Sequence, residues 1–252
     1  MLEWIVRGLR RGTVTTSYPR RPAVPPDGFR GSITTLDPRP FTGAVGLCPT
    51  GAIAVRDGRL DVDRGRCILC GLCVEREPER FAFSAVYETA ARSRGGLWLG
   101  APPAEESESP SLMAHGRVFR RSIHIRHVDA GSDGSEEWEI AALHNPYYDF
   151  QRLGFAFTAA PRHADILLVS GVGTGPMRMP LLRAWEAMPH PKAVVAAGTD
   201  ACSGGLTAEE SGGVDRILPV DVYVPGSPPS PIAILDGLML AAGIVTRARA
   251  TR

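Results

Sequence analysis

Three cysteines within seven residues constrain this chain more than any other feature of its sequence. Cys67, Cys70 and Cys73 follow the pattern C-x2-C-x2-C, whose short turns suit three irons of a [4Fe-4S] cubane. A separate Cys48-Pro49 pair stands 19 residues before the first of them. In ferredoxins with two clusters, the cysteine before proline in one run binds the cluster of the other run. The pattern therefore predicts one cubane held by Cys48, Cys67, Cys70 and Cys73.

A second cluster of the same pattern is missing. Counted at the same spacing from Cys48 and Cys73, none of its four positions is a cysteine: they are Pro38, Phe41 and Ala44, which cannot bind iron, and Glu77. All four absent thiolates belong to one cluster, so we expect one cubane and not two. Four cysteines also suit a tetrahedral zinc ion, but zinc modules usually pair two C-x2-C knuckles, so the spacing favours the cubane.

The composition narrows the class of protein further. The chain has 252 residues, enough for one small domain and one of ordinary size, and a formal net charge of +1, which gives no reason to expect a nucleic-acid partner. Its 28 glycines and 22 prolines indicate many turns and favour a mixed α/β fold. Five cysteines, an odd number with three close together, suit a metal site in a reducing compartment. With neither a secretory signal nor a membrane-spanning apolar run in view, we expect a cytoplasmic protein.

The first eleven residues have the pattern of a short amphipathic helix. Apolar and basic residues fall on opposite faces of it: Leu2, Ile5, Val6 and Leu9 on one, Arg7, Arg10 and Arg11 on the other. Such a helix suits a membrane surface or a partner protein, and so short a helix binds lipid weakly. Packing against its own domain is the interpretation that the sequence favours.

Proline and glycine divide the chain into segments. Residues 12–36 show no periodicity and are expected to be extended, and a hairpin is expected from strands at Ala52–Arg56 and Leu60–Asp63. The predicted domains are a lead-in and ferredoxin-like domain over residues 1–92, a linker over 93–117, a second domain over 118–246 and a tail over 247–252.

The second domain alternates buried apolar runs with helical patterns. The expected strands are Asp165–Ser170, Ala193–Ala197 and Ile217–Val220, and the expected helices are Leu181–Met188 and Ile232–Val245. Alternation of this kind predicts βαβ units in an α/β, flavodoxin-like, doubly wound parallel sheet. The loops that form a site are then expected at the carboxyl ends of the strands.

Motifs in both parts of the chain resemble known families. RGTVTTSYP (residues 11–19), LCPTGAI (47–53) and GRCILCGLC (65–73) resemble the ferredoxin-like subunit of formate hydrogenlyase and related group 4 [NiFe] hydrogenases. NPYYDFQRLGF (145–155), PRHADILLVSG (161–171) and PVDVYVPGSPP (219–229) resemble the small subunit of those hydrogenases, which is similar to the 20 kDa (B-type) subunit of respiratory complex I.

Together, the two resemblances imply a fused electron-transfer subunit of an energy-converting oxidoreductase complex. Its implied partners are a hydrogenase-like or complex I-like large subunit and membrane subunits, which would hold it on the cytoplasmic face of the inner membrane. No complete set of catalytic residues is visible, so we do not expect the chain to be an enzyme alone. The alternative is a structural subunit of an ion-translocating complex without hydrogen chemistry.

The resemblance also locates a second metal site, and this chain departs from it throughout. The small-subunit family binds a cubane with four cysteines in the patterns GSCxxC, GxCxxSGG and PGCPP. The corresponding residues here are Asp133, Glu136, Asp200 and Ser227, with Cys202 nearby. We therefore expect no cluster in this domain. Carboxylates this close are costly unless they are solvated, protonated, paired with Arg162 and His163, or neutralised by Mg²⁺ or Ca²⁺.

Overall fold

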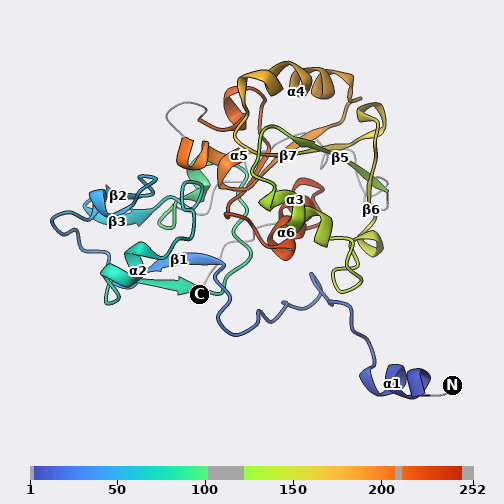
Figure 1. Ribbon diagram of the computed structural model, residues 1–252, viewed down its shortest axis with the longest axis horizontal. Coiled ribbons are helices and arrows are strands. Elements are labelled where there is room, and N and C mark those ends of the chain that lie inside the picture. The colour runs from blue at the N-terminus through green and yellow to red at the C-terminus, as the bar shows by residue number, and fades with distance from the viewer. Residues whose placement is uncertain (1–2, 102–121, 208–211, 246–252) are drawn as a thin grey trace.

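A five-stranded parallel sheet organises the C-terminal part of the molecule (Figure 1). The computed structural model describes residues 3–101, 122–207 and 212–245. The strand order is β6-β5-β7-β8-β9, and all four neighbouring pairs are parallel. In chain order the strands are β5 (Ile123–Asp129), β6 (Phe155–Phe157), β7 (Ile166–Ser170), β8 (Ala193–Ala197) and β9 (Val222–Val224). This confirms the expected α/β class, and we call residues 123–245 the larger unit.

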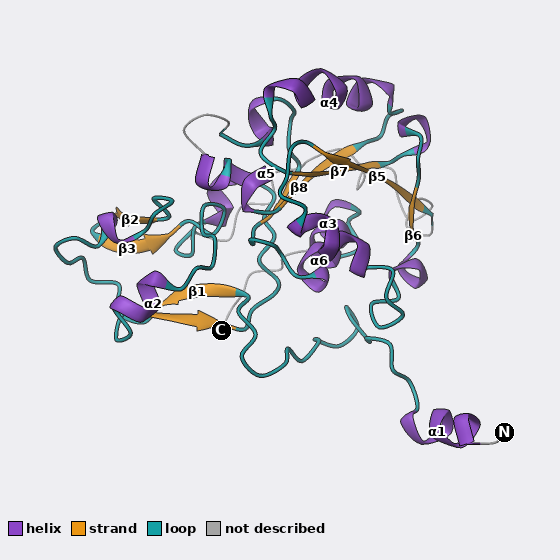
Figure 2. Ribbon diagram, viewed as in Figure 1, coloured by secondary structure: helices purple, strands orange, loops and turns teal. Residues whose placement is uncertain are grey.

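Helices cover both faces of the sheet (Figure 2). Along β7, Ile166 and Leu168 belong to the core beneath α3 (Ser135–Ala142) and α6 (Pro231–Ala241), whereas Leu167 and Val169 belong to the core beneath α4 (Gly175–Ala187). Alternate side chains of a strand point to opposite faces, so a strand that is apolar at every position must be covered twice. Polar chemistry is therefore confined to the strand ends.

Two of the three expected strands of this sheet are confirmed, and the third is wrong. Residues 217–220 follow the short helix η8 (Val214–Arg216), and the strand is β9, two residues further on. Pro219 has no backbone N–H to donate to a ladder, so an apolar run that contains it makes a poor central strand. Both expected helices are present with shifted ends. The first begins earlier, at Gly175, and the last ends at Ala241.

Two antiparallel pairs and one short helix form a small unit over residues 31–84. β1 (Ser32–Thr35) pairs with β4 (Phe81–Ser84), and β2 (Ile53–Arg56) pairs with β3 (Arg59–Val62). The expected hairpin is confirmed: Asp57 and Gly58 have φ of 50° and 72°, the positive values that a type I′ turn requires. The remaining helix is α2 (Leu72–Arg76). The further short helices of the chain are η1 (Val45–Leu47), η2 (Arg94–Leu97), α5 (Thr199–Ser203), η5 (Phe150–Leu153), η6 (Pro161–His163) and η7 (Gly205–Thr207).

The lead-in, residues 12–30, runs along the larger unit. The Thr16 N–H donates to the Tyr147 carbonyl at 2.7 Å, and the buried Tyr18 hydroxyl lies 2.8 Å from an Asp236 carboxylate oxygen. The expectation of an irregular chain over residues 12–36 is wrong at its end, where β1 forms. Its short alternating pattern gains stability only from pairing with β4, almost fifty residues later in the sequence.

The two units are joined by backbone and side-chain contacts. Ala91 and Tyr223 exchange backbone hydrogen bonds of 2.9 and 2.8 Å at the edge strand β9. Leu97 is fully buried in the core of the larger unit, although it lies in the segment expected to be a linker. Residues 102–117 of that expected linker lie outside the described residues.

The expected N-terminal helix is α1 (Glu3–Arg11), and none of its residues is buried. The expected packing of this helix on its own domain is therefore not observed. Within the described ranges, no helix combines the length and apolarity that a membrane crossing requires.

The doubly covered sheet generates a prediction about stability. We expect Leu168→Ala to lower the free energy of unfolding by about 2–5 kcal/mol, because it removes a fully buried side chain and leaves a cavity. The matched control Leu206→Ala, at a side chain that is 71% exposed, should change it by less than about 0.5 kcal/mol. Urea unfolding followed by circular dichroism measures both variants, and equal effects would contradict the two-layer packing.

Candidate functional site

The four cysteines of the predicted cubane line a single cavity in the small unit. Cys48 directly follows η1, Cys67 and Cys70 lie in the loop after β3, and Cys73 belongs to the first turn of α2. Apolar side chains complete the lining, among them Ile33, Ile53, Val62 and Leu72. Residues far apart in the sequence are thus brought to one water-poor pocket.

Local backbone geometry turns the cysteine loop around this cavity. Leu69 and Gly71 both have positive φ, of 54° and 81°. A Cβ at Gly71 would stand 2.9 Å from the Phe83 ring, so glycine is needed there both for conformation and for space. On the opposite side, the Ala52 N–H points at the Cys48 sulfur over 3.3 Å. Amide donors to sulfur are a recognised feature of cubane sites.

The thiols act on one another electrostatically. Burial is the main cause that raises the pKa of Cys67 to about 12; a backbone hydrogen bond opposes this shift, and the nearby Cys48, Cys73 and Cys70 contribute to it. Burial also raises the pKa of Cys73, with Cys48 and Cys70 adding to the effect. Four thiols held together in this way fit a positively charged metal core, which would keep them as thiolates.

The spacing of these donors bears on which metal group they fit. Among the described residues, no three His, Cys, Asp or Glu side chains come close enough together to hold one metal ion. Tetrahedral zinc needs all its sulfurs at about 2.3 Å from a single ion. A cubane takes one thiolate on each of its irons, so its ligands stand further apart. The preference for a cubane over zinc therefore rests on the cysteine spacing in the sequence.

A buried ion pair positions the start of the cysteine loop. Asp63 accepts two hydrogen bonds from Arg94, at 2.7 and 2.6 Å, and one from the Gly65 N–H at 2.9 Å. The Asp63 carbonyl in turn accepts from the Cys67 N–H at 3.1 Å. Sequence reasoning missed this pair because nothing in the local pattern connects two residues 31 positions apart.

The larger unit contacts the cysteine loop directly. The buried Thr199, at the start of α5, donates its hydroxyl to the Cys67 carbonyl at 3.0 Å. The Thr199 backbone N–H donates to the Gly226 carbonyl at 2.7 Å. Thr199 and Gly226 belong to the two loops that carry Asp200 and Ser227, so the degenerate site adjoins the predicted cubane.

Three of the four degenerate positions interact with one another. Glu136 is buried in the first turn of α3, and Asp200 lies in α5, after β8. Gly198, with φ of 97°, leaves the space that the Glu136 carboxylate occupies. Asp133 and Ser227 are exposed, and Ser227 precedes a cis proline. The structure thus groups the three carboxylates at the carboxyl ends of the strands, as the sequence predicted for a parallel sheet.

These carboxylates differ in how they hold protons. Burial, opposed by hydrogen bonds to the carboxylate and supported by the charges of Asp200 and Asp133, raises the pKa of Glu136 to about 7. Burial and Asp133 also raise the pKa of Asp200. Hydrogen bonds from Ser135 lower the pKa of Asp133, which lies at the surface. Asp133 is therefore a solvated charge, whereas Glu136 and Asp200 tend to keep their protons. The site thus avoids three adjacent buried charges.

The expected pairing of Arg162 and His163 with these acids is wrong. Both belong to η6, which precedes β7 and lies at the amino ends of the strands. The acids follow β5 and β8, so they lie at the carboxyl ends of the strands, opposite to η6. Arg162 and His163 are therefore at the other end of the sheet from the acids, although they belong to one of the family motifs.

A hydrogen-bonded network under the degenerate site was not foreseen from the sequence. His127 Nε2 lies 2.9 Å from the Ser170 hydroxyl, which donates to the Glu137 carboxylate. Ser132 donates to the other Glu137 oxygen at 2.6 Å. Burial lowers the pKa of His127, which favours its neutral form. The network holds the loop between β5 and α3 with protein groups alone.

Comparison with known proteins relates the larger unit to one family. Residues 134–241 match the family described as NADH ubiquinone oxidoreductase, 20 Kd subunit. Over 132 residues the chain is 43% identical to formate hydrogenlyase subunit 7 of Escherichia coli, and the match covers 51% of this chain and 52% of that protein. Over 128 residues it is 43% identical to the probable membrane-bound hydrogenase subunit mbhJ of Pyrococcus furiosus, covering 50% and 77%. The chain thus spans about half the length of the E. coli relative.

One solved structure is also similar to this chain. It is that of the membrane-bound sulfane sulfur reductase, an archaeal respiratory membrane complex. The matching chain is 29% identical in sequence and superposes with a TM-score of 0.44. The match covers 50% of this chain and 71% of that one.

The raised pKa of Glu136 generates a prediction about stability and pH. The folded state keeps the Glu136 proton up to a pKa of about 7, whereas the ordinary value is 4.5, so the free energy of unfolding falls as pH rises between these values. Glu136→Gln cannot lose that proton. We expect it to be more stable than wild type at pH 8, on the order of 1–2 kcal/mol, and nearly equal below the ordinary value.

Anaerobic urea unfolding across this pH range measures the difference. Glu79→Gln, at an exposed residue of the small unit, is the matched control and should follow the wild-type profile. A Glu136→Gln profile parallel to that of wild type would show that this carboxyl titrates normally.

Proposed function

The chain belongs to the family of the 20 kDa subunit of NADH ubiquinone oxidoreductase, and from this we propose that it is a one-cluster electron-transfer subunit of a membrane-associated assembly. The assembly would resemble formate hydrogenlyase or complex I, as the name of the E. coli relative and the description of the family suggest. One observation carries the proposal: four thiols line one cavity whose ligand loop is hydrogen-bonded to the family domain.

In this proposal residues 1–92 form a ferredoxin-like domain fused, through residues 93–117, to the family domain over residues 118–246. Cys48, Cys67, Cys70 and Cys73 would hold one [4Fe-4S] cluster, which accepts and releases single electrons. The chain itself supplies four thiolates, a mostly apolar lining, and an amide donor at the Cys48 sulfur. The Asp63–Arg94 pair and Thr199 fix the loop that carries Cys67.

The family domain has a different role in this proposal. Without thiolates at Asp133, Glu136, Asp200 and Ser227 it would hold no cluster, and it would dock a large subunit of the complex. The exposed Trp138 on α3, 79% accessible, lies within the same segment as Asp133 and Glu136 and suits such an interface. Membrane subunits of the complex would hold the chain at the cytoplasmic face of the inner membrane.

A second candidate function is a mainly structural subunit of an ion-translocating complex without hydrogen chemistry. The replacement of all four thiolates of the family site by oxygen groups favours it, since electron transfer weakens steeply when a relay centre is missing. The sequence of the companion large subunit separates the two functions. A large subunit without its metal-binding cysteine pairs would exclude hydrogenase activity.

The cluster is tested by iron and sulfide analysis of anaerobically purified protein together with spin-counted electron paramagnetic resonance. We expect about four irons per chain and a visible absorption band that dithionite bleaches. Cys48→Ser and Cys73→Ser should each reduce the iron content severalfold, because each removes one of four ligands. A full second cluster per chain would contradict the assignment of the family domain as cluster-free.

The fifth cysteine supplies a matched control. Cys202 is fully buried in the larger unit, away from the cavity that the other four line. Cys202→Ala should keep the iron content and the spectrum of wild type. Zinc in place of iron, in protein made with both metals available, would overturn the cubane and with it the electron-transfer role.

A further inference from the structure

The helix α1 stands apart from the rest of the molecule (Figure 1). Trp4 is 73% exposed and Leu9 is 79% exposed, and no residue of the helix is buried. A Cβ added at Gly8 would meet no atom within 4 Å. Nothing in the described part of this chain covers the apolar side chains of α1.

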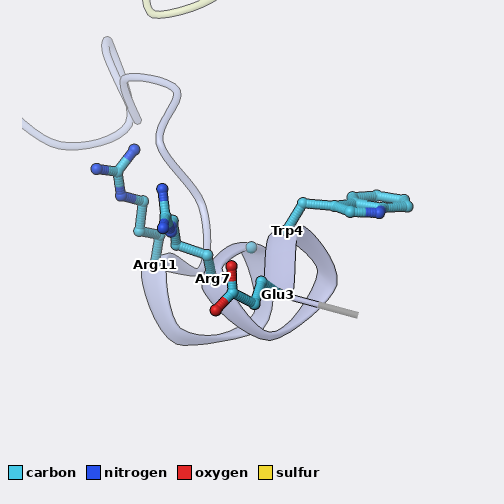
Figure 3. A pocket seen from close by; sticks show the side chains of 5 residues that line it. Glu3, Trp4, Arg7 and Arg11 are labelled. Carbon is cyan, nitrogen blue, oxygen red and sulfur yellow. The ribbon is translucent and has the colours of Figure 1, made fainter. Parts of the chain in front are cut away.

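Apolar and basic side chains lie on different sides of this helix. Glu3, Trp4, Arg7 and Arg11 line one shallow hollow on the polar side of the helix, with the Trp4 ring at its margin (Figure 3). At the helical period, Ile5, Val6 and Leu9 share one side, Arg7, Arg10 and Arg11 share the other, and Trp4 falls at the boundary beside Arg11. Three arginines outnumber the single acid, Glu3, so the polar side is net positive.

We propose that α1 lies in the headgroup region of an anionic membrane, with its apolar side toward the acyl chains. A short helix with aliphatic residues on one side, arginines on the other and a tryptophan at the boundary has the pattern of an interfacial helix. Arginines near such a surface are attracted to anionic lipids. This contact goes beyond attachment through partner subunits, because the chain itself touches the bilayer.

The charge of the polar side bears on which surface covers α1. A purely apolar groove on a partner protein would cover Ile5 and Leu9 and leave the arginines in solvent, where they add little. An anionic bilayer takes up the apolar side and attracts the basic side at once. The observations therefore favour a lipid surface over a protein groove.

The connection to the body is short and fixed at its far end. Gly12, with φ of 62°, ends the helix, and its N–H donates to the Gly8 carbonyl at 3.0 Å. Four residues further on, the Thr16 N–H is bonded to Tyr147, and Arg152 donates to the Thr16 carbonyl at 3.3 Å. Four extended residues span at most about 14 Å. The side of the larger unit that carries Tyr147 would thus face the membrane.

Sedimentation of the full chain with lipid vesicles tests the proposal. One set of vesicles is phosphatidylcholine alone, and the other is phosphatidylcholine mixed with phosphatidylglycerol. We expect binding to the mixed vesicles that weakens as salt is added, and much weaker binding to the neutral ones. Leu9→Glu should reduce binding at least tenfold, and Arg7→Gln about fivefold.

Matched controls separate this result from unfolding and from general stickiness. Val24→Glu, at a residue 88% exposed in the lead-in outside α1, should bind vesicles as wild type does. Since α1 has no buried residue, Leu9→Glu should leave the melting temperature unchanged. Equal binding to neutral vesicles, or no loss with Leu9→Glu, would overturn the proposal. Release of Leu9→Glu from its isolated complex with unaltered vesicle binding would assign α1 to a protein partner.

Discussion

Burial of the parallel sheet on both faces is the constraint on which the rest of this structure depends. Because β7 and β8 are apolar at nearly every position, helices must cover them above and below, and only the strand ends can carry polar groups. The three carboxylates, the His127–Ser170–Glu137 network and Thr199 all lie at or beside the carboxyl ends. The cysteine loop of the small unit contacts the larger unit at these same strand ends.

Three neighbouring carboxylates at the carboxyl ends of the strands set the electrostatic problem of the site. Their charges must be reduced, solvated or compensated by a cation. The chain does the first two, since Asp133 is at the surface while burial favours the protonated form of Glu136. Hydrogen bonds from Ser132 and Ser170 to Glu137 hold the loop between β5 and α3.

Contacts distant in sequence tie the lead-in, the connecting segment and the two units into one structure. Tyr18 reaches Asp236, Arg94 reaches Asp63, and Thr199 reaches Cys67. Each was invisible in the sequence, since a single polar residue in an irregular stretch has no periodic pattern to mark its partner. The same limitation explains why Arg162 and His163 were expected near the acids. They lie at the amino ends of the strands because of the direction in which the strands run, and local composition does not indicate that direction.

The sequence by itself determined the features that depend on short-range physics. Cysteine spacing identified the four thiols that line one cavity, Asp57-Gly58 identified the hairpin, and uninterrupted apolar runs identified β7 and β8. Only the tertiary structure decided that β1 pairs with β4, that Thr199 touches the carbonyl of Cys67 132 residues away, and that α1 is left uncovered. Such outcomes depend on strand order and on which surfaces remain free after the cores close, and those are properties of the whole chain.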